Sequence, residues 1–493
     1  GVADSITYPK AIALGVVNCT HLQISNTTSG ENTIRPVVTA SVYGGCENGL
    51  VTGHTHVKIM GGQIGTGFKS KELVNGVWEG DFDSMYDETY WTAAIEAING
   101  GDDAGINAAA AQFHECDAWT YEAPYAVYDI FHGASGYDSN GGALIGTNGH
   151  SFFGNVFGGG SGYYPIRPGV WRRTAGRVNG DATVEITGGH ILTSVYGGNE
   201  YTDVMGKSTI IMSGGTIGVP RTLAQINAHP VTCYLFGAGM SDTRTMFNGW
   251  TNVQEAEVTI KGGTIFGSVF GGGEDGHVLG KVTVTINEDI ASTLIGTWGT
   301  SYVDGNVFGS GRGFSGTALT AGSVGGNVKV DISGGTMLGS VYGGGRLASV
   351  GTHFVSPTIP DPSDPTQTIP NPLYGQFQDG PTHGHITVNI SGGTIGNDRE
   401  ANVAHSKGGN VFGGCMGRIK KLDNSTVNPL WPQLARAKHT KVNISGTANI
   451  KGDVFGGGEL GTVARHNSED YSGNSHVTVS GTATIGRNAF GGG

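Results

Sequence analysis

"GSVFGGGEDGHV", residues 267–278, places three glycines after a Val-Phe pair and two acids after the glycines. Glycines beside acids occur in phosphate-binding loops, in calcium loops and at tight corners, and only the calcium loop requires the acids. Variants of this stretch occur ten times in the chain, and none carries the Lys-Ser/Thr pair of a nucleotide-binding loop. The stretch is therefore interpreted as a structural repeat.

A second motif precedes most copies, for example VTIKGGTI at residues 258–265 and VNISGGTI at residues 388–395. Its apolar and polar residues alternate, which is typical of a half-buried strand. The closest two copies, at Gly188 and Gly214, lie 26 residues apart (214 − 188), which is too few for a four-stranded propeller blade. Each repeat therefore predicts one turn of an all-β, parallel β-solenoid (β-helix) of about ten turns.

Glycine supplies 89 of the 493 residues, far above ordinary usage. This excess is interpreted as repeated corners between strands, because glycine reaches positive φ without a steric clash. Gly271 and Gly343 are therefore expected to have φ > 0 and to resist replacement by valine.

One aromatic residue occupies the same position in each of the ten repeats, and these side chains are expected to stack along the axis. They are Tyr43, Phe157, Tyr196, Phe236, Phe270, Phe308, Tyr342, Phe412, Phe455 and Phe490. The excess of Phe over Tyr favours a place in the core over an outward, sugar-binding platform. The adjacent valine column competes for the same side of the strand, so both orientations stay open.

The position after the glycines varies more. It reads Glu47, Ser161, Glu200, Met240, Glu274, Arg312, Arg346, Met416 and Glu459 along the chain. A calcium row would need acids on consecutive turns, and Met and Arg interrupt the row. We interpret the column as a solvated edge with an occasional ion pair such as Glu274–Arg312, and we expect no metal site and no cofactor.

The net charge is −12 and there is no basic block, which argues against partners such as nucleic acid or anionic membrane surfaces. No apolar run approaches the length of a membrane span, so membrane insertion is not expected. The last residues, RNAFGGG, stop within a repeat. We therefore expect an excerpt of a longer chain, with solenoid at residues 1–65 and 151–493 continuing beyond both ends.

Residues 66–150 interrupt the repeats and contain the convincing helical stretches, at 87–100 and 103–119, with a dense aromatic set. This partly helical insertion is either a self-contained lobe packed on the solenoid or a lobe that binds glycans or proteins. The candidate ligand-binding residues are Trp78, Trp91, Trp119, Tyr121 and Tyr125. Two smaller insertions, a proline-rich one at 356–375 and a basic one at 417–440, are expected to be loops that could contact a partner.

A carbohydrate-active enzyme, either a polysaccharide lyase or a glycoside hydrolase, is the alternative. The tripeptide Arg418–Lys420 resembles the substrate-binding RIK of polygalacturonases, and HGH at 383–385 lies upstream. That family needs paired acids on consecutive turns, whereas Asp102-Asp103 falls in the helical insertion. We therefore predict no catalytic residues and no enzymatic activity.

The doubled SGGTI…VFGGG repeat, over most of residues 41–493, resembles the glycine-rich repeat proteins of the cell surface of gut-type Bacteroidota. The resemblance implies export, a right-handed solenoid and a structural or adhesive role outside the cell. The expected function is that of a stalk, fibre or adhesin segment. Its expected partners are glycans, host or cell-surface proteins, and neighbouring segments of a longer chain.

Overall fold

The computed structural model describes seventeen stretches of the chain. They are residues 15–29, 32–34, 36–38, 41–64, 73–74, 77–78, 154–162, 173–218, 233–241, 249–299, 304–313, 319–353, 358–364, 366–397, 408–417, 433–464 and 472–493. In these stretches all the secondary-structure elements are strands, which confirms the prediction of an all-β fold. The helices expected within 66–150 lie outside the described residues.

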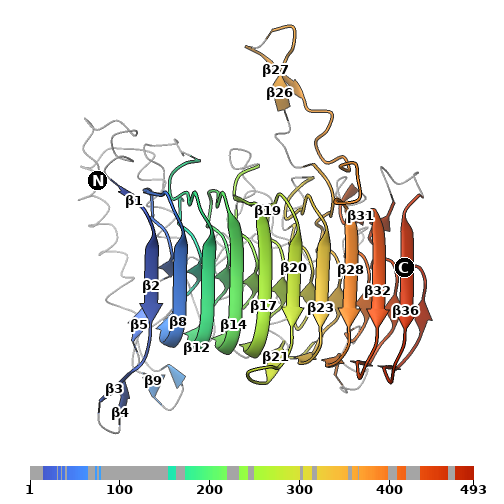
Figure 1. The fold of residues 1–493 in the computed structure, drawn as a ribbon, viewed down its shortest axis with the longest axis horizontal. Helices are drawn as coiled ribbons and strands as arrows, with labels where there is room; N and C mark the ends of the chain where they lie inside the picture. Colours follow the sequence, from blue (N-terminus) through green and yellow to red (C-terminus); the bar gives the residue numbers. More distant parts are fainter. Residues whose placement is uncertain are drawn as a thin grey trace.

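The short Val-Phe strands form a ten-stranded parallel sheet, with one strand from each repeat (Figure 1). They are β6 (Val42–Tyr43), β11 (Val156–Phe157), β13 (Val195–Tyr196), β15 (Leu235–Phe236), β18 (Val269–Phe270), β22 (Val307–Phe308), β25 (Val341–Tyr342), β30 (Val411–Phe412), β34 (Val454–Phe455) and β38 (Ala489–Phe490). We number the repeats 1 to 10 by these strands. Equivalent residues of successive repeats are in register, as Phe270 and Phe308 are.

The longer strands form a sixteen-stranded parallel sheet. Its strands are β2 (Thr20–Ile24), β5 (Val37–Val38), β8 (Thr55–Ile64), β12 (Ala182–Ile191), β14 (Lys207–Ile217), β17 (Glu255–Ile265), β20 (Val282–Ile286), β21 (Thr293–Ile295), β23 (Val328–Ile332), β24 (Thr336–Met337), β28 (His385–Ile390), β29 (Thr394–Ile395), β32 (His439–Ile444), β33 (Asn449–Ile450), β36 (Asn474–Val479) and β37 (Thr484–Ile485). The two sheets stack the repeats into an elongated body, here called the rod, which is consistent with a parallel β-solenoid (Figure 1).

Further short strands lie along the rod. Parallel pairs are formed by β1 (Val16–Val17) with β7 (Leu50–Val51), β16 (Asn252–Val253) with β19 (His277–Val278), and β31 (Arg436–Ala437) with β35 (Thr462–Val463). Antiparallel pairs are formed by β3 (Thr27–Ser29) with β4 (Asn32–Ile34), β9 (Leu73–Val74) with β10 (Val77–Trp78), and β26 (Thr358–Pro360) with β27 (Thr368–Pro370).

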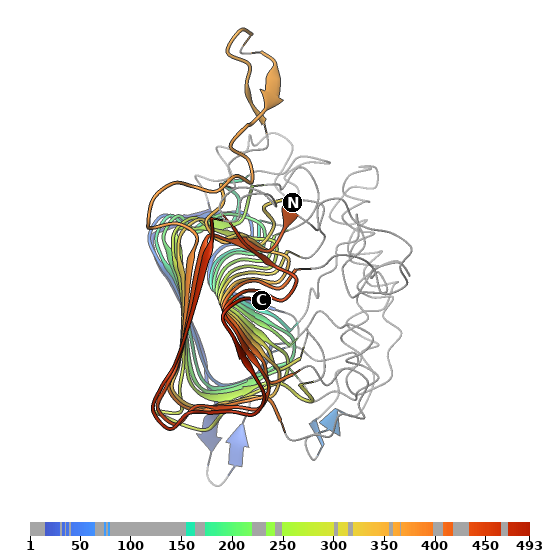
Figure 2. The same ribbon diagram turned by 90° about the vertical axis from the view of Figure 1, so that its right-hand side faces the viewer.

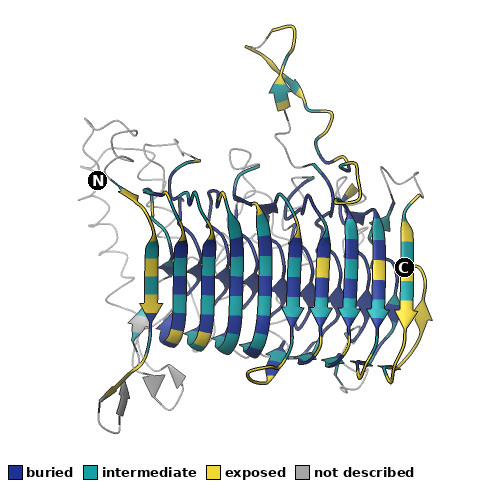
Figure 3. Ribbon diagram, viewed as in Figure 1, coloured by how far each residue is buried: buried dark blue, intermediate teal, exposed yellow. Residues whose placement is uncertain are grey.

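A single aliphatic cluster runs through the rod from Ile24 to Val454. The long strands supply every second residue to it, as Val258 and Ile260 of β17 do, because successive side chains of a strand point to opposite faces. This alternation gives the long strands in the middle of the rod their banded burial pattern (Figure 3). The core is therefore the product of the apolar-polar alternation of each repeat.

The glycine that follows each short strand from β6 to β34 is required by space. A Cβ added at Gly271 would lie 2.4 Å from the carbonyl oxygen of Gly309 in the next repeat. Gly271 and Gly343 do not have positive φ, so that expectation was wrong. Positive φ occurs at other glycines, such as Gly189 within β12 at 83° and Gly393 between β28 and β29 at 80°.

The outline of the repeats has one straight wall and one indented wall, seen along the rod in Figure 2. The two longer insertions, at 66–150 and 356–375, fall between strands of these two sheets, the first after β8 and the second after β25.

The proline-rich insertion departs from the extended loop that the sequence predicts. Its strands β26 and β27 pair as an antiparallel hairpin that projects from the rod (Figure 1). The turn between them is supported by the carboxylates of Asp361 and Asp364, which accept hydrogen bonds from the backbone N–H groups of Ser363 and Thr366 at 2.8 and 3.1 Å. Such side-chain turns are the local structure that Asp-Pro-Ser and Asp-Pro-Thr sequences favour.

Candidate functional site

The ten aromatic side chains of the short strands lie in one continuous stack. Ring centroids of neighbours are 4.6 Å apart for Phe308 and Tyr342, and 5.1 Å apart for Tyr196 and Phe236. The rings of Phe270 and Phe308 are inclined by 2°. This spacing follows from the separation of neighbouring strands in a sheet, which is about 4.8 Å.

The stack lies on the opposite face of the ten-stranded sheet from the aliphatic core. In β18, Val269 belongs to the aliphatic cluster, whereas its neighbour Phe270 belongs to a separate aromatic cluster. The stack is nevertheless buried, since Phe157, Phe236 and Phe308 have no exposed surface. The aromatic residues thus form a second core beside the first.

Most of the column after the glycines is buried beside the same aromatic cluster, whereas Glu47 in repeat 1 is exposed and Glu459 in repeat 9 is half-buried. Glu200, Glu274, Arg312 and Arg346 are 2%, 1%, 0% and 3% exposed. The prediction of a solvated edge was wrong for these residues because the chain bends at the glycines, and the bend brings the column to the aromatic cluster. Burial of charged groups is costly unless they have polar partners, and the aromatic stack supplies such partners.

Tyrosine hydroxyl groups of the stack donate hydrogen bonds to these carboxyl groups. Tyr196 donates to Glu274 at 2.5 Å and Tyr342 donates to Glu459 at 2.6 Å. Glu200 accepts from the hydroxyl of Tyr43 at 3.0 Å and from that of Ser161 at 2.5 Å. In each pair the tyrosine stands two repeats before the glutamate, so the hydrogen bond spans the intervening repeat.

The residue types in the aromatic stack and in the column after the glycines agree with this offset of two repeats along the rod. Every tyrosine of the stack has a glutamate two repeats later, and no phenylalanine does. The phenylalanines correspond to other residues: Phe157 to Met240, Phe236 to Arg312, Phe270 to Arg346 and Phe308 to Met416. The hydroxyl group is therefore present where a carboxyl group can accept its hydrogen bond. We call the three Tyr-Glu pairs clasps.

Burial governs the protonation of the two most enclosed carboxyl groups. It raises the pKa of Glu200 to about 7, although the hydrogen bonds from Ser161 and Tyr43 act in the opposite direction. It also raises the pKa of Glu274 to about 7, against the nearby positive charge of Arg312. Burial, followed by the charge of Glu274, raises the pKa of Tyr196 well above its usual value. The Tyr196 hydroxyl therefore keeps its proton and acts as the donor.

We expect Tyr342→Phe and Glu459→Met to compensate each other, because together they reproduce the Phe308/Met416 pairing of the previous repeats. Each single change leaves one polar group without its partner, at about 1 to 3 kcal/mol of unfolding free energy. The double variant should recover about 1 kcal/mol relative to the sum of the single changes. Urea unfolding of the four proteins gives this coupling energy.

The matched control combines Tyr342→Phe with Glu200→Met, whose side chains do not contact each other. Their effects should add, because distant sites are energetically independent. Additive effects for Tyr342 and Glu459 as well would show that the hydroxyl and carboxyl groups of this clasp are not coupled.

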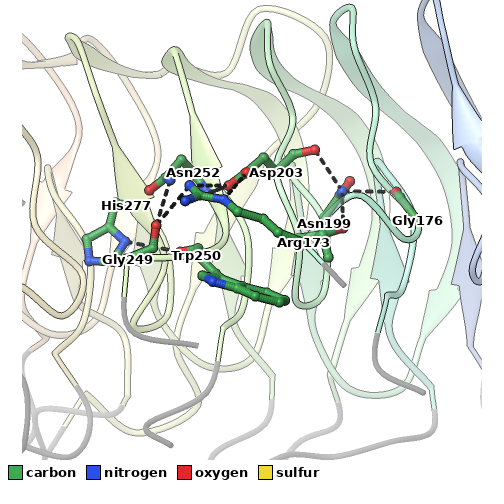
Figure 4. Close-up of polar contacts among 9 residues, drawn as sticks. Arg173, Gly176, Asn199, Asp203, Gly249, Trp250, Asn252 and His277 are labelled. Atoms are coloured by element: carbon green, nitrogen blue, oxygen red, sulfur yellow. Dashed lines mark hydrogen bonds and ion pairs between the residues drawn. The ribbon is translucent and has the colours of Figure 1, made fainter. Parts of the chain in front are cut away.

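A second polar cluster joins four repeats along another edge of the rod (Figure 4). Arg173 donates to both carboxylate oxygens of Asp203, from Nε at 2.5 Å and from Nη2 at 3.2 Å. The backbone N–H of Asn252 donates to the same carboxylate at 2.9 Å. Arg173 Nη2 and Asn252 Nδ2 both donate to the carbonyl oxygen of Gly249, at 3.0 and 2.8 Å.

His277 is the member of this cluster in the fourth of these repeats. Its Nδ1 lies 3.2 Å from the carbonyl oxygen of Trp250 (Figure 4). Burial lowers the pKa of His277 to about 4, so the ring is neutral at physiological pH. The carboxylate of Asp203 is held by Arg173 and by the backbone N–H of Asn252, which belong to neighbouring repeats. We call this cluster a clamp between repeats.

The candidate binding residues of the insertion cannot be located. Trp91, Trp119, Tyr121 and Tyr125 lie outside the described residues, and for Trp78 only the backbone of β10 is described. Arg418 and Lys420 also lie outside them.

The two histidines of HGH have structural surroundings. His383 Nδ1 lies 2.9 Å from the carbonyl oxygen of Gly325. The ring of His385 packs edge-on against that of His439, with centroids 4.7 Å apart.

Comparison with models of known protein families, with curated proteins and with solved structures gave no match. Among the residues that the structure describes, no helix has the length and apolar character needed to cross a membrane. A search of the same residues found no group of three or more His, Cys, Asp or Glu side chains placed to hold a metal ion.

Proposed function

We propose that this chain is a non-enzymatic structural or adhesive segment of an extracellular protein, a stalk, fibre or adhesin. In this proposal it is a right-handed β-solenoid of about ten turns. The observation that supports it best is the stack of ten aromatic rings, which accompanies the aliphatic core through every repeat. A body that repeats the same contacts along its length is suited to hold binding segments at a distance.

The insertions supply the binding segments in this proposal. The insertion at 66–150 lies between β8 and β11 and the proline-rich one lies between β25 and β28, so both can vary without interrupting a strand of either sheet. The insertion at 66–150 has the highest concentration of aromatic residues, and aromatic side chains are frequent anchors in glycan and protein recognition. The resemblance to cell-surface repeat proteins of Bacteroidota supports a bacterial origin and glycans or surface proteins as partners.

We expect deletion of residues 66–150 to abolish binding to glycans while leaving the rod folded. The insertion enters after β8 and leaves before β11, and the partners of these strands, β12 and β13, are retained. A glycan array should detect binding by the full chain and none by the deletion variant. Trp91→Ala and Trp119→Ala should each weaken binding at least tenfold if they anchor the ligand.

Deletion of the β26–β27 hairpin at 358–370 is the matched control, because it removes another projecting insertion and should leave glycan binding unchanged. Full binding by the rod without 66–150 would contradict the assignment of recognition to that insertion. Release of new reducing or unsaturated sugar ends from any bound glycan would contradict the non-enzymatic role and favour the carbohydrate-active alternative.

A further inference from the structure

Two of the three clasps enclose carboxyl groups that have almost no contact with solvent. The exposed fractions of Glu200 and Glu274 are 2% and 1%, whereas Glu459 is only half-buried. Glu200 accepts hydrogen bonds from two neutral hydroxyl groups, those of Tyr43 and Ser161. Ionisation therefore places a negative charge between two neutral donors in a buried site.

We infer that the clasps of Tyr43 with Glu200 and of Tyr196 with Glu274 are a proton-dependent latch, which holds repeats 1 to 5 together firmly when these carboxyl groups are neutral and loosens their packing when they ionise. The inference does not depend on glycan binding. It follows from the position of the clasps, since each hydrogen bond joins repeats n and n + 2 and so braces three consecutive repeats.

The charged groups around each carboxyl group act differently in the two clasps. Glu47, two column positions earlier in repeat 1, adds a like charge that disfavours ionisation of Glu200. Arg312, aligned with Glu274 in the next repeat, favours ionisation of Glu274. Burial remains the largest influence on both groups and raises both pKa values to about 7. The latch therefore operates close to neutral pH.

The direction of the effect follows from the raised pKa. In the unfolded chain these glutamates ionise near their ordinary value of 4.5, whereas in the folded chain they retain protons up to about pH 7. The stabilisation from the neutral carboxyl groups is complete below about pH 4.5 and is lost as the pH rises through 7. The rod should consequently be firmer in mildly acidic surroundings than at slightly alkaline pH.

The test compares urea unfolding midpoints of the full chain at pH 5.5 and pH 8. The wild type should have the lower midpoint at pH 8, and Glu200→Gln with Glu274→Gln should remove most of this difference. Glutamine keeps a carbonyl oxygen that accepts the tyrosine hydrogen bond and cannot ionise. Glu459→Gln is the control and should leave the pH dependence of the wild type in place, because its carboxyl group is partly solvated.

A second measurement does not depend on the variants folding. Carbon-13 NMR of the wild type labelled at the glutamate carboxyl carbons should show two groups that titrate near pH 7, and both signals should disappear from the double variant. An unchanged pH dependence in a folded double variant, or titration of all carboxyl groups below pH 5.5, would overturn the latch.

Discussion

Phe308→Ala is expected to lower the unfolding free energy by about 3 to 5 kcal/mol, the usual cost of truncating a buried phenylalanine. The ring of Phe308 has no exposed surface and packs between those of Phe270 and Tyr342, with centroids 4.7 and 4.6 Å away. Truncation removes both stacking contacts and leaves a cavity in the middle of the stack. Both neighbours are held by their own strands, so they cannot move to fill it.

Phe490→Ala is the control for this change. Phe490 occupies the same position in repeat 10, but it is 45% exposed and stacks on one side, against Phe455 at 5.0 Å. Its truncation should cost about 1 kcal/mol or less, since surface changes rarely cost more. Equal losses at both positions in urea unfolding would show that stacking on two sides does not determine the stability of the column.

The all-β, parallel arrangement could be predicted because every repeat carries the same strand pattern. The alternation in VTIKGGTI at 258–265 specifies a half-buried strand, and its return in later repeats specifies a parallel neighbour in register. A single repeat would leave strand type and pairing ambiguous. The repetition resolves both ambiguities. A strand needs a hydrogen-bonded partner, and the equivalent strand of the next repeat can supply it.

The clasps also have a signal in the sequence, but it relates residues two repeats apart and not residues of adjacent repeats. Comparison of Glu274 with Arg312, one repeat later, suggests an exposed ion pair, and this interpretation was wrong about exposure. Comparison of Tyr196 with Glu274, two repeats later, gives the pairing that the structure contains. The offset could not be deduced from strand spacing alone, because it depends on how the chain bends between the short strand and the column.

The clamp of Arg173 and Asp203 has no periodic signal. Arg173, Asp203 and Asn252 lie outside the SGGTI and VFGGG motifs that define the repeats. Comparison of equivalent motif positions therefore does not identify these contacts, because they are made by residues that the repeat pattern does not specify.

Gly271→Val is expected to destabilise the rod by about 3 kcal/mol or more, at the upper end of overpacking effects. The Cβ would lie 2.4 Å from the carbonyl oxygen of Gly309 and 2.6 Å from the side chains of Val282 and Val284. The carbonyl oxygen is backbone of the neighbouring strand and cannot rotate away as a side chain could. The close approach of backbones, and not a left-handed conformation, therefore makes glycine necessary at this position.

The same clash recurs in the equivalent glycines of the other repeats. The distance from an added Cβ to the carbonyl oxygen of the next repeat ranges from 2.1 Å at Gly237 and Gly309 to 2.4 Å at Gly271 and Gly343. Gly491 is the exception, because nothing lies within 4 Å of its added Cβ. Gly491→Val is thus a control that shares the Phe-Gly-Gly-Gly sequence and meets no atom within 4 Å, and it should change the urea midpoint little. If valine were equally harmful at Gly271 and Gly491, its effect would arise from local backbone conformation, and the close packing of successive repeats would not be the reason for the glycine column.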